Sequence, residues 1–411
     1  MFFKKKSLVE SDKNARALLA SAEKVFNYRC DLFSENERAR IEEDVSALRS
    51  ARTPDALKAA SARLTETLRE LGGTIFPQGI PAEFTDLVVV AAILVFGIRA
   101  FFFQPFKIPT NSMYPTYNGM TSAVCAEPLP EWRKWTERIF RSASFYEFSA
   151  PESGEIAVSF SRAERVGSSD FFEMLVGDSV LRLELPRDFS IDSVLLEKFF
   201  PDEFAKKELS LAERRNNVLR RVSAGALGRA MRGERVFIKT GIRVNAGEKF
   251  LSFRIFGGDM VLVNRFAYHF TRPRAGDPFV FRTHNIPGLG NVELYYIKRL
   301  AGTPGDKLVV SDKKLFRNGE LASSADAFSK NNSRDFANEY FGYLPAAGGN
   351  GLFSMPLHKP ITVPEGFYYA LGDNSSNSFD SRGWGCVPVA DVVGKAAFVL
   401  YPFSRNWGIA E

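Results

Sequence analysis

The stretch Phe101–Thr116, FFFQPFKIPTNSMYPT, joins the end of a long apolar run to a loop that contains three prolines. Ser112 lies in this loop, between a Pro-Thr-Asn turn and a Met-Tyr-Pro-Thr turn. A serine hydroxyl on a rigid loop is a candidate nucleophile, but it needs a base to take its proton. We therefore predict that Ser112 reacts at a bilayer surface, and that other parts of the chain supply the base and the substrate groove.

The apolar run before this loop spans residues 87–103 and contains 17 residues with one charge, Arg99, near its end. A hydrocarbon core of about 30 Å needs about 20 helical residues. The run is just long enough if the Arg99 side chain extends to the interface. A buried core helix is the alternative. Pro81 before the run and Pro105 after it favour a transmembrane helix over residues 83–104.

Composition excludes several classes of function. The 411 residues, 45% hydrophobic and 25% charged, are typical of a globular protein with two or three domains. The net charge of +6 is mild and the one short basic run is Lys4–Lys6, so no nucleic-acid partner is expected. The three histidines are scattered and the cysteines form no CxxC motif, so no metal and no cofactor are predicted. Cys125 and Cys386 form either a disulfide or two reduced thiols.

Residues 1–82 have the pattern of a small helical region. Ser34 followed by Glu37 predicts a capping box at the start of one helix, and Thr53-Pro54 predicts the start of another that ends at Gly72. The basic first residues lead into a charged amphipathic stretch, which argues against a cleavable signal peptide. This region could bind a partner that the sequence does not identify.

The rest of the chain, residues 105–411, is predicted to be mainly β. Short apolar runs separated by Gly, Pro and Asp turns predict strands at 260–264, 278–282, 294–300, 308–310, 366–371 and 393–400. The preceding segment, residues 121–257, mixes strand-like runs with helical ones. Within it, Trp132, Trp135, Ile139 and Phe140 recur at helical spacing, and we favour a core-facing helix over one that contacts a membrane.

A base for Ser112 is suggested by the strand-like segment LYYIKRL, residues 294–300. On a strand, Tyr296 and Lys298 face one side and Arg299 faces the other. A buried lysine has a lowered pKa because burial disfavours the ammonium form, and a general base must be neutral. Arginine stays charged and could not serve. The alternative is that Lys298 lies at the edge of a strand and that its side chain extends into water.

A third stretch, Gly372–Pro388, reads GDNSSNSFDSRGWGCVP and follows an apolar strand. Such a run of short polar residues is normally a solvated loop. It could equally supply hydroxyls and carboxylates that orient a lysine and fix a loop through arginine pairs.

Four segments now resemble, in order, the four motifs of bacterial type I signal peptidases (leader peptidases). They are Ile108–Thr116, Gly258–Tyr268, Tyr296–Asp306 and Gly372–Pro388. The resemblance implies a signal-peptidase-like antiparallel β fold, with one transmembrane helix and an N-terminal helical region. It implies a Ser–Lys serine endopeptidase that removes signal peptides from exported preproteins after a small residue, at an Ala-x-Ala site.

The same resemblance implies a place in the cell and a domain order. The protein would be a monomer in the lipid bilayer of the bacterial inner membrane, with residues 1–82 in the cytosol, a single span at 83–104 and an extracytoplasmic protease domain at 105–411. Residues 121–257 would be a large insertion, and residues 311–365 a variable subdomain.

The resemblance also assigns roles to single residues. Ser112 would be the nucleophile and Lys298 the general base, Thr110 would complete an oxyanion hole with the backbone N–H of Ser112, and Ser378 would orient the lysine. The supporting ion pairs would be Arg299 with Asp373 and Arg382 with Asp380. The substrate-binding wall would comprise Phe106, Ile108, Pro109, Met113, Val261, Val263, Tyr296 and Ile297.

Departures from the family pattern occur at Asn111, where glycine is usual, at Ser375-Ser376, where Arg-Asp is usual, and at Cys386, where an aromatic residue is usual. The change at 375–376 removes ion pairs beside the site and puts the detailed bracing in doubt. Two alternatives remain: another Ser–Lys protease of related fold, such as the self-cleaving repressors, or a catalytically silent membrane-anchored scaffold.

Overall fold

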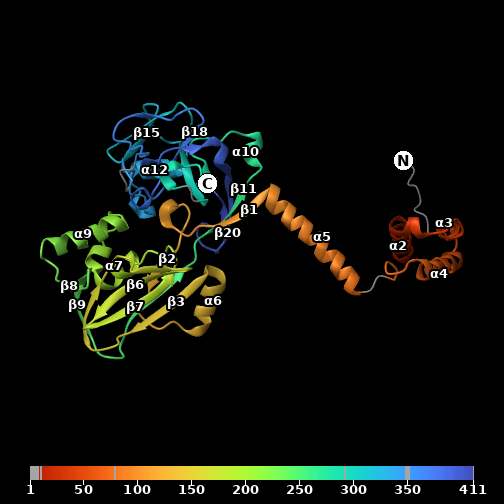
Figure 1. Ribbon diagram of the computed structural model, residues 1–411, viewed down its shortest axis with the longest axis horizontal. Coiled ribbons are helices and arrows are strands. Elements are labelled where there is room, and N and C mark those ends of the chain that lie inside the picture. Colours follow the sequence, from red (N-terminus) through yellow and green to blue (C-terminus); the bar gives the residue numbers. More distant parts are fainter. Residues whose placement is uncertain (1–8, 10–11, 78–79, 291–292, 348–351, 411) are drawn as a thin grey trace. The chain divides into compact units, whose positions relative to one another are not determined.

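The computed structural model (Figure 1) describes residues 9, 12–77, 80–290, 293–347 and 352–410. The chain forms two compact units, Met1–Gly97 and Ile98–Glu411. The first is helical and the second is mainly β, as the sequence predicted.

In the described part of the first unit, three helices that precede α5 pack around a small apolar core. They are α2 (Lys13–Arg29), α3 (Glu35–Ser50) and α4 (Pro54–Leu71). Ser34 and Glu37 form the predicted capping box of α3, and the Thr53 side chain accepts a hydrogen bond from a backbone N–H in the first turn of α4. The core is formed by fully buried side chains such as Val25, Leu48, Leu64 and Leu68. The predicted helix starts are therefore confirmed.

Helix α5 spans Ile80–Phe101. The prediction of a transmembrane helix over residues 83–104 is not supported, because no helix among the described residues is both long and apolar enough to cross a bilayer. Within the 22 residues of α5, the uncharged run between Asp86 and Arg99 contains 12 residues.

The main sheet of the second unit contains eight described strands, and each neighbouring pair is antiparallel. Their spatial order is β1 (Phe103–Lys107), β11 (Met260–Asn264), β20 (Val392–Tyr401), β12 (Pro278–Arg282), β13 (Tyr295–Gly302), β18 (Phe367–Leu371) and β19 (Val387–Pro388), with β21 (Gly408–Ile409) beside β20. The strands predicted at 260–264 and 278–282 have the observed bounds.

Two strands of this sheet position the candidate site. β1 forms one edge and leads directly into the loop that contains Ser112. β13 lies inside the sheet, where Lys298 is opposite Phe279 of β12 and Arg299 is opposite Leu371 of β18. Side chains alternate along a strand, so Lys298 and Arg299 occupy opposite faces, as predicted.

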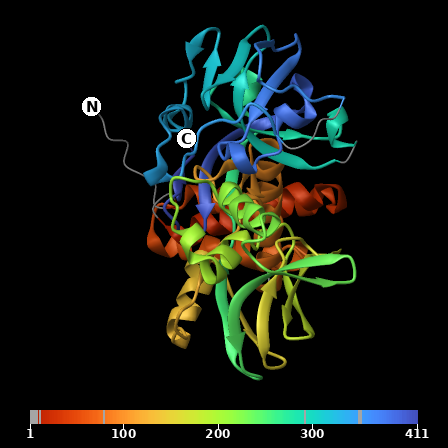
Figure 2. The same ribbon diagram turned by 90° about the vertical axis from the view of Figure 1, so that its left-hand side faces the viewer.

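Residues 121–257, here called the insertion lobe, form two further sheets. The first comprises β2 (Thr121–Val124), β10 (Lys249–Phe256) and β3 (Ala143–Ser149). The second comprises β5 (Glu164–Val166), β6 (Ser169–Val176), β4 (Gly154–Val158), β9 (Arg235–Val244), β8 (Arg229–Arg232) and β7 (Ser179–Pro186). Its helices are α6 (Glu131–Arg141), α7 (Asp192–Phe199), α8 (Pro201–Phe204) and α9 (Leu211–Ser223). Figures 1 and 2 show this yellow and green lobe beside the teal and blue strands of the main sheet.

The core-facing prediction for the helix with Trp132 was wrong. In α6, Trp132 and Trp135 are 70% and 60% exposed, and Ile139 and Phe140 are also exposed. The opposite face makes the packing contact through a charge: the Arg254 guanidinium donates two hydrogen bonds to the Glu137 carboxylate, at 2.8 and 2.9 Å. The aromatic face of α6 is therefore left to solvent.

A four-stranded sheet completes the second unit. It comprises β16 (Glu320–Leu321), β15 (Lys314–Arg317), β14 (Lys307–Ser311) and β17 (Ile361–Thr362). The remaining short helices are α10 (Ala267–Phe270), α11 (Asp326–Ser333), α12 (Ser381–Trp384) and the 3₁₀ turns η1 (Cys30–Leu32), η2 (Asn111–Met113), η3 (Pro287–Leu289), η4 (Phe336–Asn338), η5 (Ser375–Asn377) and η6 (Val389–Asp391).

Cys125 and Cys386 are free thiols, so the disulfide alternative is wrong.

Candidate active site

Ser112 lies in the 3₁₀ turn η2, and backbone contacts from a distant loop fix its position. The Asn374 backbone N–H donates to the Ser112 carbonyl at 3.0 Å, and the Asn374 side-chain amide donates to the Asn111 carbonyl at 3.0 Å. The Asn111 side chain in turn donates to the Met120 carbonyl at 2.8 Å. Asn111, a departure from the usual glycine, thus closes its own loop. Ser112 itself is 7% exposed.

Lys298 reaches this serine from β13. Its Nζ donates a hydrogen bond to Ser112 Oγ at 2.6 Å, although 186 positions separate the two residues. It also contacts the Ile297 carbonyl at 3.3 Å. The alternative of an exposed lysine at a strand edge is therefore wrong, since Lys298 is 5% exposed.

Burial is the main cause of a shifted lysine pKa. It lowers the pKa of Lys298 from 10.5 to about 8, against the opposing effect of the Asp380 and Asp373 carboxylates, while the Arg382 charge adds to the lowering. At pH 7.5, a pKa of about 8 leaves about a quarter of the lysine neutral, whereas a pKa of 10.5 would leave about one part in a thousand. The site can therefore hold a neutral amine beside the serine hydroxyl.

Two buried ion pairs hold the strand and loop around this amine. Arg299 Nε and Nη2 donate to the two oxygens of Asp373 at 2.8 and 2.7 Å. Arg382 Nε and Nη2 donate to the two oxygens of Asp380 at 2.8 and 2.7 Å. Both pairs are bidentate and almost fully buried, which makes them rigid as well as strong. Gly372–Pro388 is thus no solvated loop, because two of its carboxylates are buried in these pairs.

The serine pair at 375–376 was expected to weaken this bracing. Instead, the Ser375 hydroxyl accepts a hydrogen bond from Arg382 Nη1 at 2.7 Å and another from the Leu344 backbone N–H at 2.8 Å. The Ser375 carbonyl accepts from Arg382 Nη2 at 2.9 Å. A short hydroxyl therefore fills part of the guanidinium's hydrogen-bonding capacity.

Ser378 lies close to the serine and lysine, but its hydroxyl makes no hydrogen bond to any residue in the described part of the chain. Gly372 explains the close packing here, because a Cβ at this position would meet the Ser378 side chain and would lie 2.5 Å from the Ser112 carbonyl oxygen. The predicted contact from Ser378 to Lys298 is therefore not formed in this structure, although Ser378 lines the same cleft.

A cleft of about 850 Å³ contains Ser112, Lys298 and Ser378. Thr110, predicted to donate to an oxyanion, also lines it and is exposed. Seven of the eight predicted substrate-binding residues line the cleft, namely Phe106, Ile108, Pro109, Val261, Val263, Tyr296 and Ile297. Met113 does not, because its side chain is fully buried in the apolar core beneath the cleft.

The sequence analysis missed the part of this cleft that the insertion lobe provides. Arg165, Arg187, Asp188 and Ser190 line it together with residues of the main sheet. No motif marks these four residues. Only the fold brings β5 and the loop after β7 next to Ser112.

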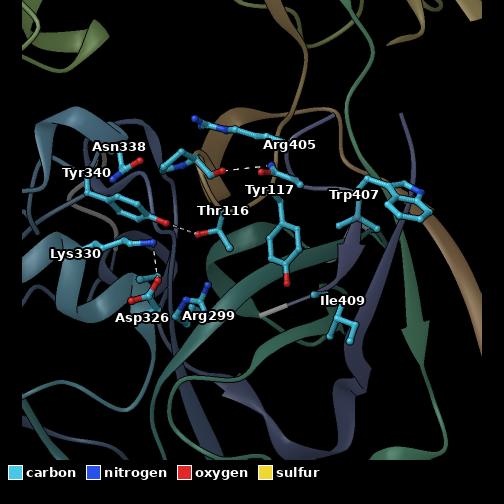
Figure 3. A pocket seen from close by; sticks show the side chains of 15 residues that line it. Thr116, Tyr117, Arg299, Asp326, Lys330, Asn338, Tyr340, Arg405, Trp407 and Ile409 are labelled. Carbon is cyan, nitrogen blue, oxygen red and sulfur yellow. Dashed lines mark hydrogen bonds and ion pairs between the residues drawn. The ribbon is translucent and has the colours of Figure 1, made fainter. Parts of the chain in front are cut away.

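A second pocket, of about 360 Å³, is lined by residues that include Thr116, Tyr117, Tyr340 and Trp407 (Figure 3). It contains neither Ser112 nor Lys298, and its polar side chains bind one another: Lys330 pairs with Asp326 at 2.6 Å, and the hydroxyls of Thr116 and Tyr340 are 3.1 Å apart. The candidate active site is therefore the larger cleft.

The fold and site together define a β-rich protein with a buried Ser–Lys pair, and comparison with known proteins adds the family. The profile described as "Signal peptidase, peptidase S26" matches residues 82–165 and 249–401, more than half of the chain. The chain therefore belongs to the signal peptidase family, peptidase S26. The match omits residues 166–248, which form most of the insertion lobe.

Individual relatives agree with this family. The chain is 34% identical over 167 residues to signal peptidase I of Pseudomonas fluorescens, covering 34% of this chain and 57% of the relative. It is 31% identical over 153 residues to a probable signal peptidase I-1 of a Synechocystis species (37% and 66%) and 30% identical over 153 residues to thylakoidal processing peptidase 1 of Arabidopsis thaliana (36% and 38%). The matched part thus spans between about a third and two thirds of these relatives.

One solved structure is also similar in sequence. The crystal structure of a signal peptidase I from Enterococcus faecalis V583 is 27% identical, and the match covers 30% of this chain and 97% of that one. Its TM-score against this chain is 0.21.

Proposed function

We propose that this chain is a serine endopeptidase that removes N-terminal signal peptides from preproteins, with Ser112 as nucleophile and Lys298 as general base. The observation that carries the proposal is the 2.6 Å hydrogen bond between a buried lysine with a pKa of about 8 and a serine hydroxyl in a cleft. Family membership supports the same activity.

The reaction follows from the two groups. Neutral Lys298 Nζ takes the proton of Ser112 Oγ as this oxygen attacks the carbonyl carbon of the scissile bond. When the C–N bond breaks, the lysine ammonium returns its proton to the leaving amine. Lysine then takes a proton from water, whose oxygen attacks the carbonyl carbon of the acyl ester. When the ester C–O bond breaks, the lysine ammonium returns this proton to Ser112 Oγ and the signal peptide leaves. Lysine thus does the work that histidine does in other serine proteases.

Two further residues receive supporting roles in this proposal. The Thr110 hydroxyl, with the Ser112 backbone N–H, stabilises the oxyanion; one such donor is typically worth about 3 kcal/mol. The Ser378 hydroxyl, which has no partner among the described side chains and backbone groups, would accept a hydrogen bond from Lys298 during the reaction. Apo sites often have such contacts incompletely formed.

The cleft wall supports a preference for small residues beside the scissile bond. Its apolar members, among them Ile108, Val261 and Val263, are buried and present no charged or hydrogen-bonding side chain to the substrate. An extended substrate could pair with the edge strand that carries the loop, as in other peptide-binding sheets. The proposed cleavage site is of the Ala-x-Ala type.

The lipid surface is a further part of the proposal. Between Leu87 and Ile98, α5 leaves most of its large apolar side chains about half exposed or more. In α6, Trp132 and Trp135 are exposed beside the basic residues Arg133 and Arg138. Exposed tryptophan flanked by cations is typical of helices that lie in a membrane interface. Action at a membrane, where signal peptides are held, fits these surfaces.

The experiment is a cleavage assay in detergent with a preprotein that carries an Ala-x-Ala site. We expect the wild type to cut after the second Ala, and Ser112→Ala and Lys298→Ala to lose measurable activity. Ser333→Ala and Lys307→Ala replace exposed residues outside the cleft and serve as matched controls. Equal cutting by the Ser112→Ala variant and the wild type would refute the proposal.

A further inference from the structure

The insertion lobe places basic side chains inside the cleft that contains Ser112. The basic residues that line the cleft are Lys107, Arg165, Arg187 and Lys298, whereas Asp188 is the one carboxylate among the lining residues described. Lys298 is used by the proposed reaction. Arg187 lies in the part of the chain that the family profile does not match, and Arg165 is the last residue of the first matched segment. The proposed reaction gives neither arginine a role.

Arg165 binds two carboxylates and forms a rigid frame with them. Its Nε and Nη2 donate to the two oxygens of Asp170 at 2.6 and 2.9 Å, and Nη2 also donates to Asp188 Oδ1 at 2.6 Å. Asp170 is almost fully buried, and the hydrogen bond from Arg165 lowers its pKa to about 2. We call Arg165, Asp170 and Asp188 the arginine frame.

The arginine frame also fixes the backbone next to Arg187. Asp188 has φ of 66°, a left-handed conformation that is unfavourable for a residue other than glycine. Its backbone N–H donates to Asp170 Oδ2 at 2.9 Å, and the Arg187 backbone N–H donates to the Ser168 carbonyl at 2.9 Å. The position of Arg187 at the cleft is therefore set by backbone hydrogen bonds, to the Ser168 carbonyl and, through Asp188, to the buried Asp170 carboxylate.

The Arg187 guanidinium itself makes only long contacts with other groups of the described chain. Its nearest carboxylate oxygen is Asp188 Oδ2 at 3.9 Å, its hydrogen bond to the Gly167 carbonyl is long at 3.5 Å, and its side chain is 55% exposed. Asp188 pairs with Arg165, and Asp170 pairs with both Arg165 and Arg162, the latter at 3.5 Å. With Arg187, three arginines therefore face two carboxylates. Arg187 thus keeps several N–H donors and an uncompensated positive charge at the cleft.

We propose that Arg187, positioned by the arginine frame, binds an acidic side chain of the preprotein close to the scissile bond. A guanidinium matches a carboxylate through two parallel hydrogen bonds, which gives orientation as well as attraction. The ligand is a substrate carboxylate because the substrate must occupy this cleft for Ser112 to reach it. The inference rests on the proposed function and adds a charge preference to the small-residue preference.

The test uses peptides that share one Ala-x-Ala site and carry a single Glu at a different flanking position in each peptide. Each Glu peptide is paired with a peptide that has Gln at the same position. In neutral detergent at low salt, we expect kcat/KM of the wild type to favour Glu over Gln at one or two positions by about fivefold to tenfold. Arg187→Gln should bring this ratio to about one, and Arg187→Glu should favour a Lys peptide instead. Arg243→Gln, an exposed arginine of the same lobe outside the cleft, should keep the wild-type ratio.

Binding separates this inference from the proposed activity. The same peptide pairs are titrated against the Ser112→Ala variant, and fluorescence anisotropy gives the Kd for each. A Glu preference in binding without cleavage by the wild type would support the subsite and reject the proposed function. Equal Kd values at every position, or a Glu preference that survives in Arg187→Gln, would overturn the subsite. An effect of Arg187→Gln seen only with phosphatidylglycerol vesicles would assign the arginine to a lipid phosphate and would also overturn it.

Discussion

Replacing Lys298 by methionine should make the protein more stable at neutral pH while abolishing its activity. Burial lowers the pKa of Lys298 from 10.5 to about 8, so holding its charged form at pH 7 costs about 3 kcal/mol of folding free energy, at 1.36 kcal/mol per pKa unit. Methionine has a similar length and no charge. The lost hydrogen bond to Ser112 Oγ offsets about 1 kcal/mol. The expected net gain at pH 7 is therefore about 2 kcal/mol.

The pH dependence follows from the direction of the pKa shift. Because the pKa of Lys298 is lower in the folded chain, the unfolded chain binds more protons between about pH 8 and 10.5, and the wild type gains stability as the pH rises through this window. The cost of the charge falls to about 1 kcal/mol at pH 10. The advantage of Lys298→Met should thus shrink by about 2 kcal/mol between pH 7 and pH 10, whatever the packing effect of the methionine.

Urea unfolding followed by tryptophan fluorescence measures this difference. Trp384 is fully buried in the core of the main sheet, whereas Trp132, Trp135 and Trp407 are 70%, 60% and 52% exposed, so the signal reports mainly on the unit that contains Lys298. The exposed Lys307, changed to methionine, should not reproduce the gain at pH 7. A Lys298→Met advantage that stays constant or grows up to pH 10 would refute the reasoning that burial lowers this pKa.

Two further predictions concern catalysis. Below about pH 8, kcat/KM for preprotein cleavage should rise about tenfold per pH unit and then level off, because only neutral Lys298 accepts the serine proton; a flat profile from pH 6 to 9 would exclude the lysine as base. Gly372→Ala should lower kcat at least tenfold, because the new Cβ would push against the nucleophile loop and the Ser378 side chain. Gly97→Ala, where a Cβ meets nothing within 4 Å, is its control, and equal activity of the two variants would contradict the prediction.

The sequence predicted those helices and strands whose signals lie within a few neighbouring residues. The capping box at Ser34 and Glu37 and the strands at 260–264 and 278–282 have the bounds that the sequence indicates. The prediction of a transmembrane helix over residues 83–104 stays unsupported, since no helix among the described residues is both long and apolar enough to cross a bilayer. The prediction for α6 failed because amphipathic spacing identifies an apolar face but does not identify what covers it.

The sequence by itself determined which groups are available for chemistry: a serine on a proline-braced loop, a lysine that alternates with an arginine on one strand, and a loop with two carboxylates. These follow from covalent order and from the two-residue period of a strand. Only the tertiary structure decided that Ser112 and Lys298, 186 positions apart, lie 2.6 Å from each other and away from water. It also decided that Arg187 shares their cleft. Burial and through-space contact depend on packing between distant segments, which no local pattern records.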